Sequence, residues 1–167
     1  MMSLKTKRKI AIVIFCITIL ALLWIFSNSM FSKEASNAQS TKVAEFLKPI
    51  YEKILPLFGK EATAANLNHY VRKTAHFAEY ALLGFLLYGS LRLYHFKKKH
   101  IPLLSFPICV LCAGIDETIQ YFMPDRGPMF KDVVLDSCGA LAGILVCMAV
   151  YGIAKAIFVK KTSQKQS

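Results

Sequence analysis

The chain has 167 residues and a formal net charge of +11, and 55% of its residues are hydrophobic against 19% charged. Soluble domains average about 45–50% apolar and about 25% charged residues, so this composition disfavours a soluble globular domain. Nucleic-acid binding is excluded as the explanation of the charge, because many of the basic residues flank long apolar runs, as in proteins that contact anionic lipid. The five cysteines all lie inside those runs, and their odd number argues against a disulfide framework.

Four apolar runs each approach the ~20 residues needed to cross a hydrocarbon core. We therefore predict an all-α, integral membrane four-helix bundle that forms a single domain over residues 1–167, with an outer loop at 27–74. Lysines and arginines gather beside the first, second and fourth runs, which predicts cytoplasmic N- and C-termini by the positive-inside rule. The first run is longer than the apolar part of a signal peptide, so we expect it to be retained. The predicted transmembrane helices are approximately residues 10–26, 75–94, 101–121 and 133–154.

The outer loop contains an amphipathic segment. Residues 27–40 are polar and rich in serine, which predicts an irregular loop. Over residues 42–58, apolar side chains recur every three or four positions among charged ones, which predicts an amphipathic helix. Pro49 is expected to kink this helix, and the Pro-Leu-Phe-Gly sequence at 56–59 to end it. The helix could lie in the outer membrane interface or cap the bundle as a lid, and the sequence leaves both open.

The last predicted transmembrane helix carries a G-x-x-x-G pattern at Gly139 and Gly143. Small residues at this spacing allow two helix backbones to approach closely. The pattern could pack this helix within the bundle, or it could mediate a homodimer.

Polar residues share helix faces near the outer ends of the last three predicted transmembrane helices. Side chains three or four positions apart lie on one face of a helix. Carboxylates at the edge of the hydrocarbon core are costly, so we expect these faces to turn toward one another. The pairs are His76 with Glu79, Glu117 with Gln120, Asp116 with Gln120, and Asp132 with Asp136.

Two interpretations of these polar residues remain open. In the first, Arg126 and Lys73 neutralise the acids Glu79, Glu117 and Asp136, and the network only closes the outer end of the bundle. In the second, the network is a functional site, in which His76 with Glu79 or Asp136 acts as a general base with its orienting carboxylate. Arg126 and Lys73 would then hold a phosphate or a carboxylate.

The signal for a metal is weak. Ligands could come from His76, Glu79, Glu117 and Asp136, but only one histidine is well placed and no H-E-x-x-H motif occurs. We therefore predict no metal and no cofactor.

Three blocks of the sequence resemble the VanZ-like family, which is named for a protein associated with teicoplanin resistance. They are residues 73–84, 116–126 and 131–140. Relatives carry His before the glutamine and Gly before the arginine, whereas this chain has Ile119 and Asp125, and the missing His weighs against a two-histidine metal site. The resemblance implies a membrane and cell-envelope context with glycopeptide resistance, and it implies no particular reaction. By position it also implies a set of ligand-binding residues, namely Lys73, His76, Glu79, Glu117, Gln120, Arg126, Asp132 and Asp136.

The leading hypothesis is a multi-pass plasma-membrane protein whose outer-facing polar pocket binds a lipid head group, a lipid-linked wall precursor or a lipoglycopeptide. Membrane lipids are expected partners and nucleic acid is not. One alternative is an enzyme that modifies an outer-leaflet lipid or wall precursor, with His76, Glu79, Glu117 and Asp136 as candidate catalytic residues. Another is a structural or accessory membrane protein in which the polar network only joins helices.

Overall fold

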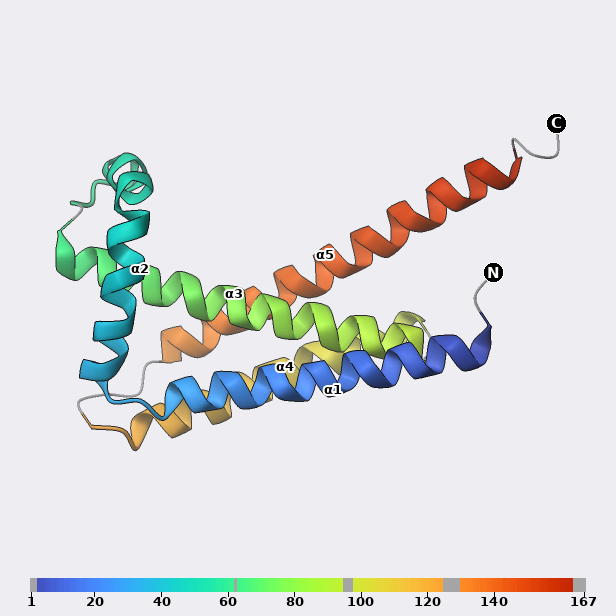
Figure 1. Ribbon diagram of the computed structural model, residues 1–167, viewed down its shortest axis with the longest axis horizontal. Coiled ribbons are helices and arrows are strands. Elements are labelled where there is room, and N and C mark those ends of the chain that lie inside the picture. The colour runs from blue at the N-terminus through green and yellow to red at the C-terminus, as the bar shows by residue number, and fades with distance from the viewer. Residues whose placement is uncertain (1–2, 62, 95–97, 125–129, 164–167) are drawn as a thin grey trace.

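A computed structural model describes residues 3–61, 63–94, 98–124 and 130–163, and these residues form helices without any strand among them. Figure 1 shows the arrangement, with α1, α3, α4 and α5 running back and forth along one axis and α2 crossing one end. The α-helices are α1 (Leu4–Ser29), α2 (Lys33–Ile54), α3 (Ala64–Leu93), α4 (Ile101–Tyr121) and α5 (Phe130–Ser163). Two short 3₁₀ helices, η1 (Leu55–Phe58) and η2 (Lys98–His100), precede α3 and α4.

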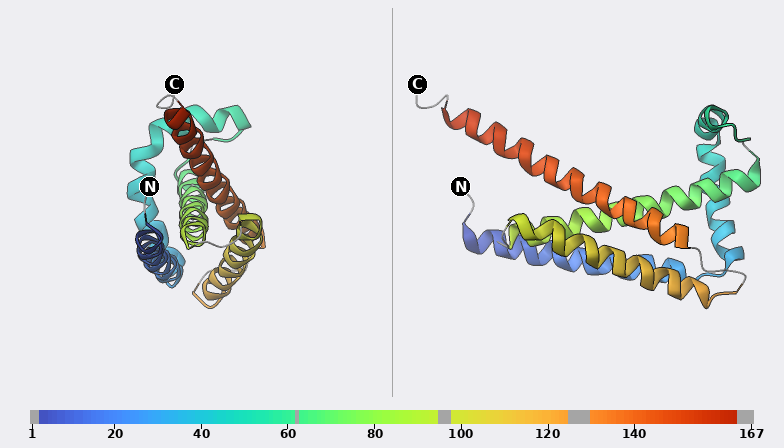
Figure 2. Two further views of the ribbon diagram at one scale, coloured as in Figure 1. Left: turned by 90° about the vertical axis from the view of Figure 1, so that its right-hand side faces the viewer. Right: turned by 180° about the vertical axis from the view of Figure 1, so that it is seen from behind.

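Helix α3 is the centre of the structure, since it contacts each of the other four α-helices. The main core cluster is built from α1, α3, α4 and α5, with Ile25, Tyr80, Cys109 and Ala140 among its members. The start of α1 and the end of α5 lie at the end of the bundle opposite α2, and the last part of α5 extends away from the other helices (Figure 2). Helices α1, α3, α4 and α5 thus alternate in direction along the chain. Successive membrane crossings are expected to alternate in this way.

Among the described residues, three helices are long and apolar enough to cross a membrane: Leu4–Ser29, Ile101–Tyr121 and Phe130–Ile157. Their apolar side chains are largely on the outside, as Leu20 and Trp24 show at 65% exposure each. A soluble monomer rarely exposes apolar surface on this scale, so the helices are suited to a lipid environment. Helix α3 is 30 residues long, but its first half is polar and it is not among the three. The fourth predicted crossing, 75–94, therefore stays a prediction.

The predicted loop over residues 27–40 is wrong. Helix α1 continues to Ser29, and only residues 30–32 separate it from α2. The physical reason is helix capping, because the Ser32 hydroxyl accepts a hydrogen bond from the Ala35 amide at 3.3 Å and so starts a helix where serines had suggested a loop. The predicted end of the amphipathic segment is confirmed, since α2 runs through Pro49 into η1 and stops at Gly59, whose φ of 65° is left-handed.

The central helix is longer than the crossing predicted at 75–94. Helix α3 begins at Ala64, well before residue 75, and the Thr63 hydroxyl caps it by accepting from the Asn66 amide at 3.3 Å. At the other end of the chain, α5 continues to Ser163, beyond the predicted residue 154. Both differences have one cause: an apolar run marks the part of a helix that suits hydrocarbon, whereas caps and turns mark where the helix ends.

Helices α3 and α5 approach so closely that their backbones touch. A Cβ atom added at Gly139 would overlap the backbone carbonyl of Phe77, and one added at Gly143 would overlap that of Ala81. The G-x-x-x-G pattern therefore packs α5 within the bundle, which confirms the first of the two interpretations. A homodimer remains a prediction, and it would need a different face of α5.

Candidate functional site

The buried acidic residues Asp116, Glu117 and Asp136 lie toward the end that α2 crosses. The C-terminal ends of α1 and α4, the N-terminal end of α5 and the first half of α3 come together there (Figure 1). This arrangement follows from the alternating helix directions. They bring segments that are far apart in the sequence to the same position along the axis of the bundle.

The centre of this region is a cluster of one histidine and two aspartates. His76 of α3, Asp116 of α4 and Asp136 of α5 each offer a nitrogen or oxygen atom within 4.8 Å of the others. Asp116 is 0% exposed and Asp136 2% exposed. Asp116 was recognised in the sequence as a costly carboxylate, but it was left out of the predicted ligand-binding set. Its four-residue spacing from Gln120 was the signal that could have included it.

Tyr80 lies one turn along α3 from His76 and is completely buried. Its hydroxyl is close enough to Asp116 and Asp136 for their charges to act on it. Among the described residues, neither the Tyr80 hydroxyl nor Asp136 Oδ1 has a hydrogen-bond partner. Most buried polar atoms in proteins do have one. These two atoms therefore mark a place where the protein alone leaves polar groups unsatisfied.

Amide side chains hold the surrounding carboxylates in place. Gln120 Nε2 donates to Asp116 Oδ2 at 3.0 Å and, more weakly, to the Ser29 hydroxyl at 3.5 Å. Asn28 Nδ2 donates to Glu79 Oε1 at 3.0 Å. The end of α1 thus contributes two polar residues to the site that the predicted set did not contain. Their position in a Ser-Asn-Ser sequence at the end of an apolar run was the available signal.

Lys73 forms an ion pair with Asp132, which joins α3 to α5. The two side chains are 18% and 20% exposed, so the pair lies at the rim of the region. The charge of Lys73 also reaches Asp136, although the direct contact is with Asp132. Neutralisation of Glu79, Glu117 and Asp136 by Lys73 and Arg126 therefore stays a prediction, with Asp132 at the start of α5 as the direct partner of Lys73. Arg126 and Asp125 lie outside the described residues.

A polar cavity of about 180 Å³ opens between α1, α2 and α3. Arg72, His76 and Glu79 of α3 form one wall, and Asn28 of α1 joins them. Ser36, Gln39, Ser40 and Val43 of α2 line the opposite wall. His76 therefore lines this cavity and also belongs to the buried cluster. Arg72 additionally donates from Nη1 to Asn37 Oδ1 at 3.4 Å, which ties α3 to α2.

Glu117 lines a different cavity, of about 410 Å³, between α4 and the start of α5. The other lining residues include Thr118, Tyr121, Phe130 and Val133. Its charge reaches Asp136, so the two acids influence each other without sharing a cavity. The structure thus divides the predicted set: His76 and Glu79 line the α2 cavity, His76 and Asp136 lie in the cluster, and Glu117 lines the cavity between α4 and α5.

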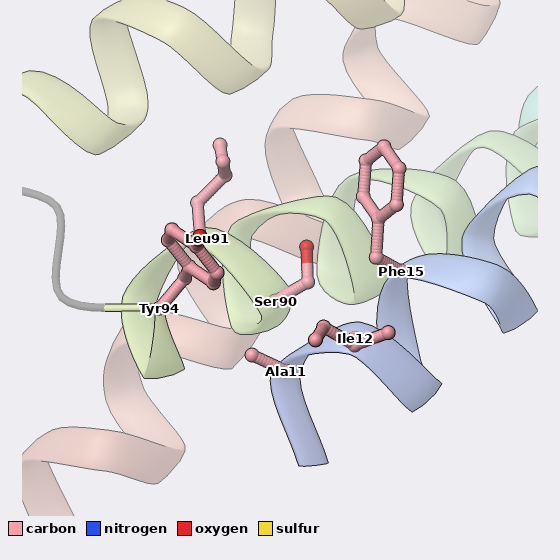
Figure 3. Close-up of a pocket in the computed structure, with 6 residues that line it drawn as sticks. All are labelled: Ala11, Ile12, Phe15, Ser90, Leu91 and Tyr94. Atoms are coloured by element: carbon pink, nitrogen blue, oxygen red, sulfur yellow. The ribbon is translucent and has the colours of Figure 1, made fainter. Parts of the chain in front are cut away.

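A further cavity of about 200 Å³ lies at the opposite end of the bundle, between facing stretches of α1 and α3 (Figure 3). Its lining is apolar apart from Ser90 and the hydroxyl of Tyr94. The Ser90 hydroxyl already donates to the Leu87 carbonyl at 2.9 Å. This cavity therefore lacks the charged groups that distinguish the α2 end.

Long apolar helices with exposed apolar side chains, enclosing charged groups at one end, define a helical membrane protein with a buried polar site. The chain belongs to the VanZ/LLP1 family, whose family model matches residues 12–152 and so includes every residue of the predicted ligand-binding set. The resemblance found in the sequence is confirmed. The chain matches none of the curated proteins and none of the solved structures with which it was compared.

Proposed function

We propose that this protein is a multi-pass plasma-membrane protein of the cell envelope that binds the anionic head group of an outer-leaflet lipid or lipid-linked wall precursor. The observation that carries the proposal is the polar cavity between α1, α2 and α3, where Arg72 and His76 stand beside Glu79 and Asn28. In this proposal α1, α3, α4 and α5 cross the membrane, the cavity faces outward, and occupancy of the cavity underlies glycopeptide (teicoplanin) resistance.

Basic and aromatic residues support this orientation. The guanidinium of Arg8 lies 5.9 Å from the ring centroid of Tyr94, and that of Arg92 lies 5.3 Å from the ring centroid of Tyr151. All four residues are at the end of the bundle opposite α2. Arginine is enriched on the cytoplasmic side of membrane proteins, whereas tyrosine is enriched at both interfaces. The α2 cavity would then lie at the outer interface.

The exposed face of α2 supports a position in that interface. Ser36, Gln39 and Val43 of the cavity wall are three and four residues apart, and Phe46 and Ile50 continue the same stripe. Phe46 is 83% exposed and Ile50 53% exposed. In the first half of α2 this face lines the cavity. In the second half the same face leaves apolar side chains exposed at the surface of the protein. An amphipathic helix of this kind lies in the membrane interface, with its apolar side chains in contact with acyl chains.

The size and chemistry of the cavity favour a head group over a whole lipoglycopeptide. Its volume of about 180 Å³ is below the ~300–1,000 Å³ typical of sites for drug-sized ligands. Arginine recognises phosphate through parallel hydrogen bonds, and Arg72 is the permanent cation of the cavity. The rest of an amphiphilic ligand would remain in the bilayer beside α2.

Binding can be measured on purified protein in nanodiscs by native mass spectrometry, with and without an anionic phospholipid. A hydrogen bond to a charged group contributes about 1.5–3 kcal/mol, so Arg72→Ala should weaken binding roughly 10- to 100-fold. Lys60→Ala removes an exposed cation near α2 but outside the cavity, and it should leave binding unchanged. Equal affinity for wild type and Arg72→Ala, with both proteins folded, would refute the proposal.

The second candidate function is an enzyme acting on the same class of ligand. It is favoured by His76, which lines the cavity and has a carboxylate of Asp116 or Asp136 within 4.8 Å. A carboxylate behind a histidine orients it as a general base. Turnover of a labelled envelope lipid that His76→Ala abolishes would establish the enzyme, whereas saturable binding without turnover would establish the binding protein. Absence of both would leave the network as a structural junction between helices.

A further inference from the structure

We propose that His76, Asp116 and Asp136 form a binding site for a divalent metal ion at the centre of the bundle, behind the α2 cavity. The three residues come from three different helices, and their donor atoms converge within 4.8 Å of one another. An ion at the centre of such a triangle lies at most about 2.8 Å from each donor, and a small side-chain movement brings this to the ~2.0–2.2 Å of zinc–nitrogen and zinc–oxygen bonds.

Unsatisfied atoms provide the second, independent observation. Asp136 is 2% exposed, and its Oδ1 has no hydrogen-bond partner among the described residues. A carboxyl oxygen in that position needs a donor, a cation or a proton of its own. The hydroxyl of Tyr80, which is fully buried one turn along α3 from His76, also lacks a partner in the described part of the chain. A metal ion would satisfy Asp136, and a water bound to that ion would satisfy Tyr80.

The charges of the two aspartates in the cluster also favour a bound cation. Two ionised aspartates this close together in a buried region would repel each other, and each would carry a desolvation cost. Lys73, the lysine whose charge reaches Asp136, makes its direct ion pair with Asp132 at the rim. A divalent cation held by both carboxylates would offset their charge at the point where it is concentrated.

The neighbouring residues are arranged as they are around metal ligands. Gln120 donates to Asp116 Oδ2 at 3.0 Å, which fixes the orientation of that carboxylate. Groups of this kind commonly orient the side chains that bind a metal. The site needs only one histidine, so the isoleucine at position 119 does not disable it.

The donor set selects the class of metal. One imidazole and two carboxylates suit Zn²⁺ or Mn²⁺, whereas Ca²⁺ prefers six to eight oxygen ligands. Three protein ligands would leave a coordination position for water, and one of the three, His76, also lines the α2 cavity. The site does not depend on the proposed head-group ligand, since either could bind in the absence of the other.

The test uses full-length protein in detergent, stripped with EDTA and dialysed against Zn²⁺ or Mn²⁺, with bound metal measured by mass spectrometry. We expect one ion per chain for wild type and affinity at least ~100-fold weaker for Asp136→Asn. Glu52→Gln is the control, because it removes an exposed acid of α2 that lies outside the cluster. This variant should keep full metal binding.

The electronic absorption of bound Co²⁺ supplies a second readout on wild type alone, in case Asp136→Asn fails to fold. A three-ligand nitrogen–oxygen site should give a Co²⁺ spectrum that excess Zn²⁺ removes. Less than a tenth of an equivalent of either metal on folded wild type would overturn the proposal, as would equal loss of binding in Glu52→Gln and Asp136→Asn. In those outcomes shared protons, not a metal, would hold the cluster together.

Discussion

Replacement of Gly143 by alanine should strongly destabilise the bundle. The new Cβ would overlap the backbone carbonyl of Ala81, and a backbone carbonyl cannot rotate away as a side chain can. Overpacking of a well-packed core typically costs about 1–3 kcal/mol. The cost here should lie at the upper end of that range, because α3 and α5 must separate along their contact. Separation would also move His76 away from Asp136 and weaken metal binding.

Gly152 offers a control on the same helix. A Cβ atom at this position meets nothing within 4 Å, so Gly152→Ala should be neutral or should stabilise α5 by about 0.5–1 kcal/mol. The assay is thermal unfolding of both variants in detergent at several protein-to-detergent ratios. Equal unfolding temperatures for Gly143→Ala and Gly152→Ala would refute the close α3–α5 contact. An effect of Gly143→Ala that disappears on dilution would instead place the glycine at a dimer interface.

Three other predictions concern contacts of the α2 end. A double-mutant cycle on Lys73→Ala and Asp132→Asn should give a coupling energy of about 0.5–3 kcal/mol in thermal unfolding, and a value near zero would show that the pair does not form. Asn28→Ala should cost about 1–3 kcal/mol, because Glu79 loses a buried donor; restoration of stability by Glu79→Gln in the same chain would support that cause. Phe46→Gln should leave the unfolding temperature in detergent unchanged but speed proteolysis of α2 in liposomes, and unchanged proteolysis there would place α2 away from the lipid.

The parts of the fold that could be predicted from the sequence are those with a local physical cause. The apolar runs that became α1, α4 and α5 are set by hydrocarbon thickness, and Gly139 with Gly143 indicates close packing without reference to any partner. Helix ends were predicted less well. They depend on single hydrogen bonds, such as those accepted by Ser32 and Thr63, and the same residue types are equally common in loops.

The candidate site shows a similar division. The sequence could place His76 and Asp136 at the same end of the predicted bundle. Both the direction of each helix and the cost of burying a charge can be inferred from the sequence. The pairing of Lys73 with Asp132 could not be predicted from the sequence, since it depends on how α3 is rotated about its axis relative to α5. The contribution of Asn28 depends on the register of α1, which an unbroken apolar run does not specify.

The three-residue link between α1 and α2 has a consequence for how a ligand reaches the cavity. Three extended residues span about 10 Å at most, so α2 cannot swing far from the end of α1. In the proposed arrangement a lipid would enter sideways, by diffusing within its own leaflet. Its effective concentration is then its mole fraction among the surrounding lipids, and the total amount in the sample is irrelevant. Occupancy would therefore rise with enrichment of the ligand in the membrane and fall whenever detergent dilutes the lipids around α2.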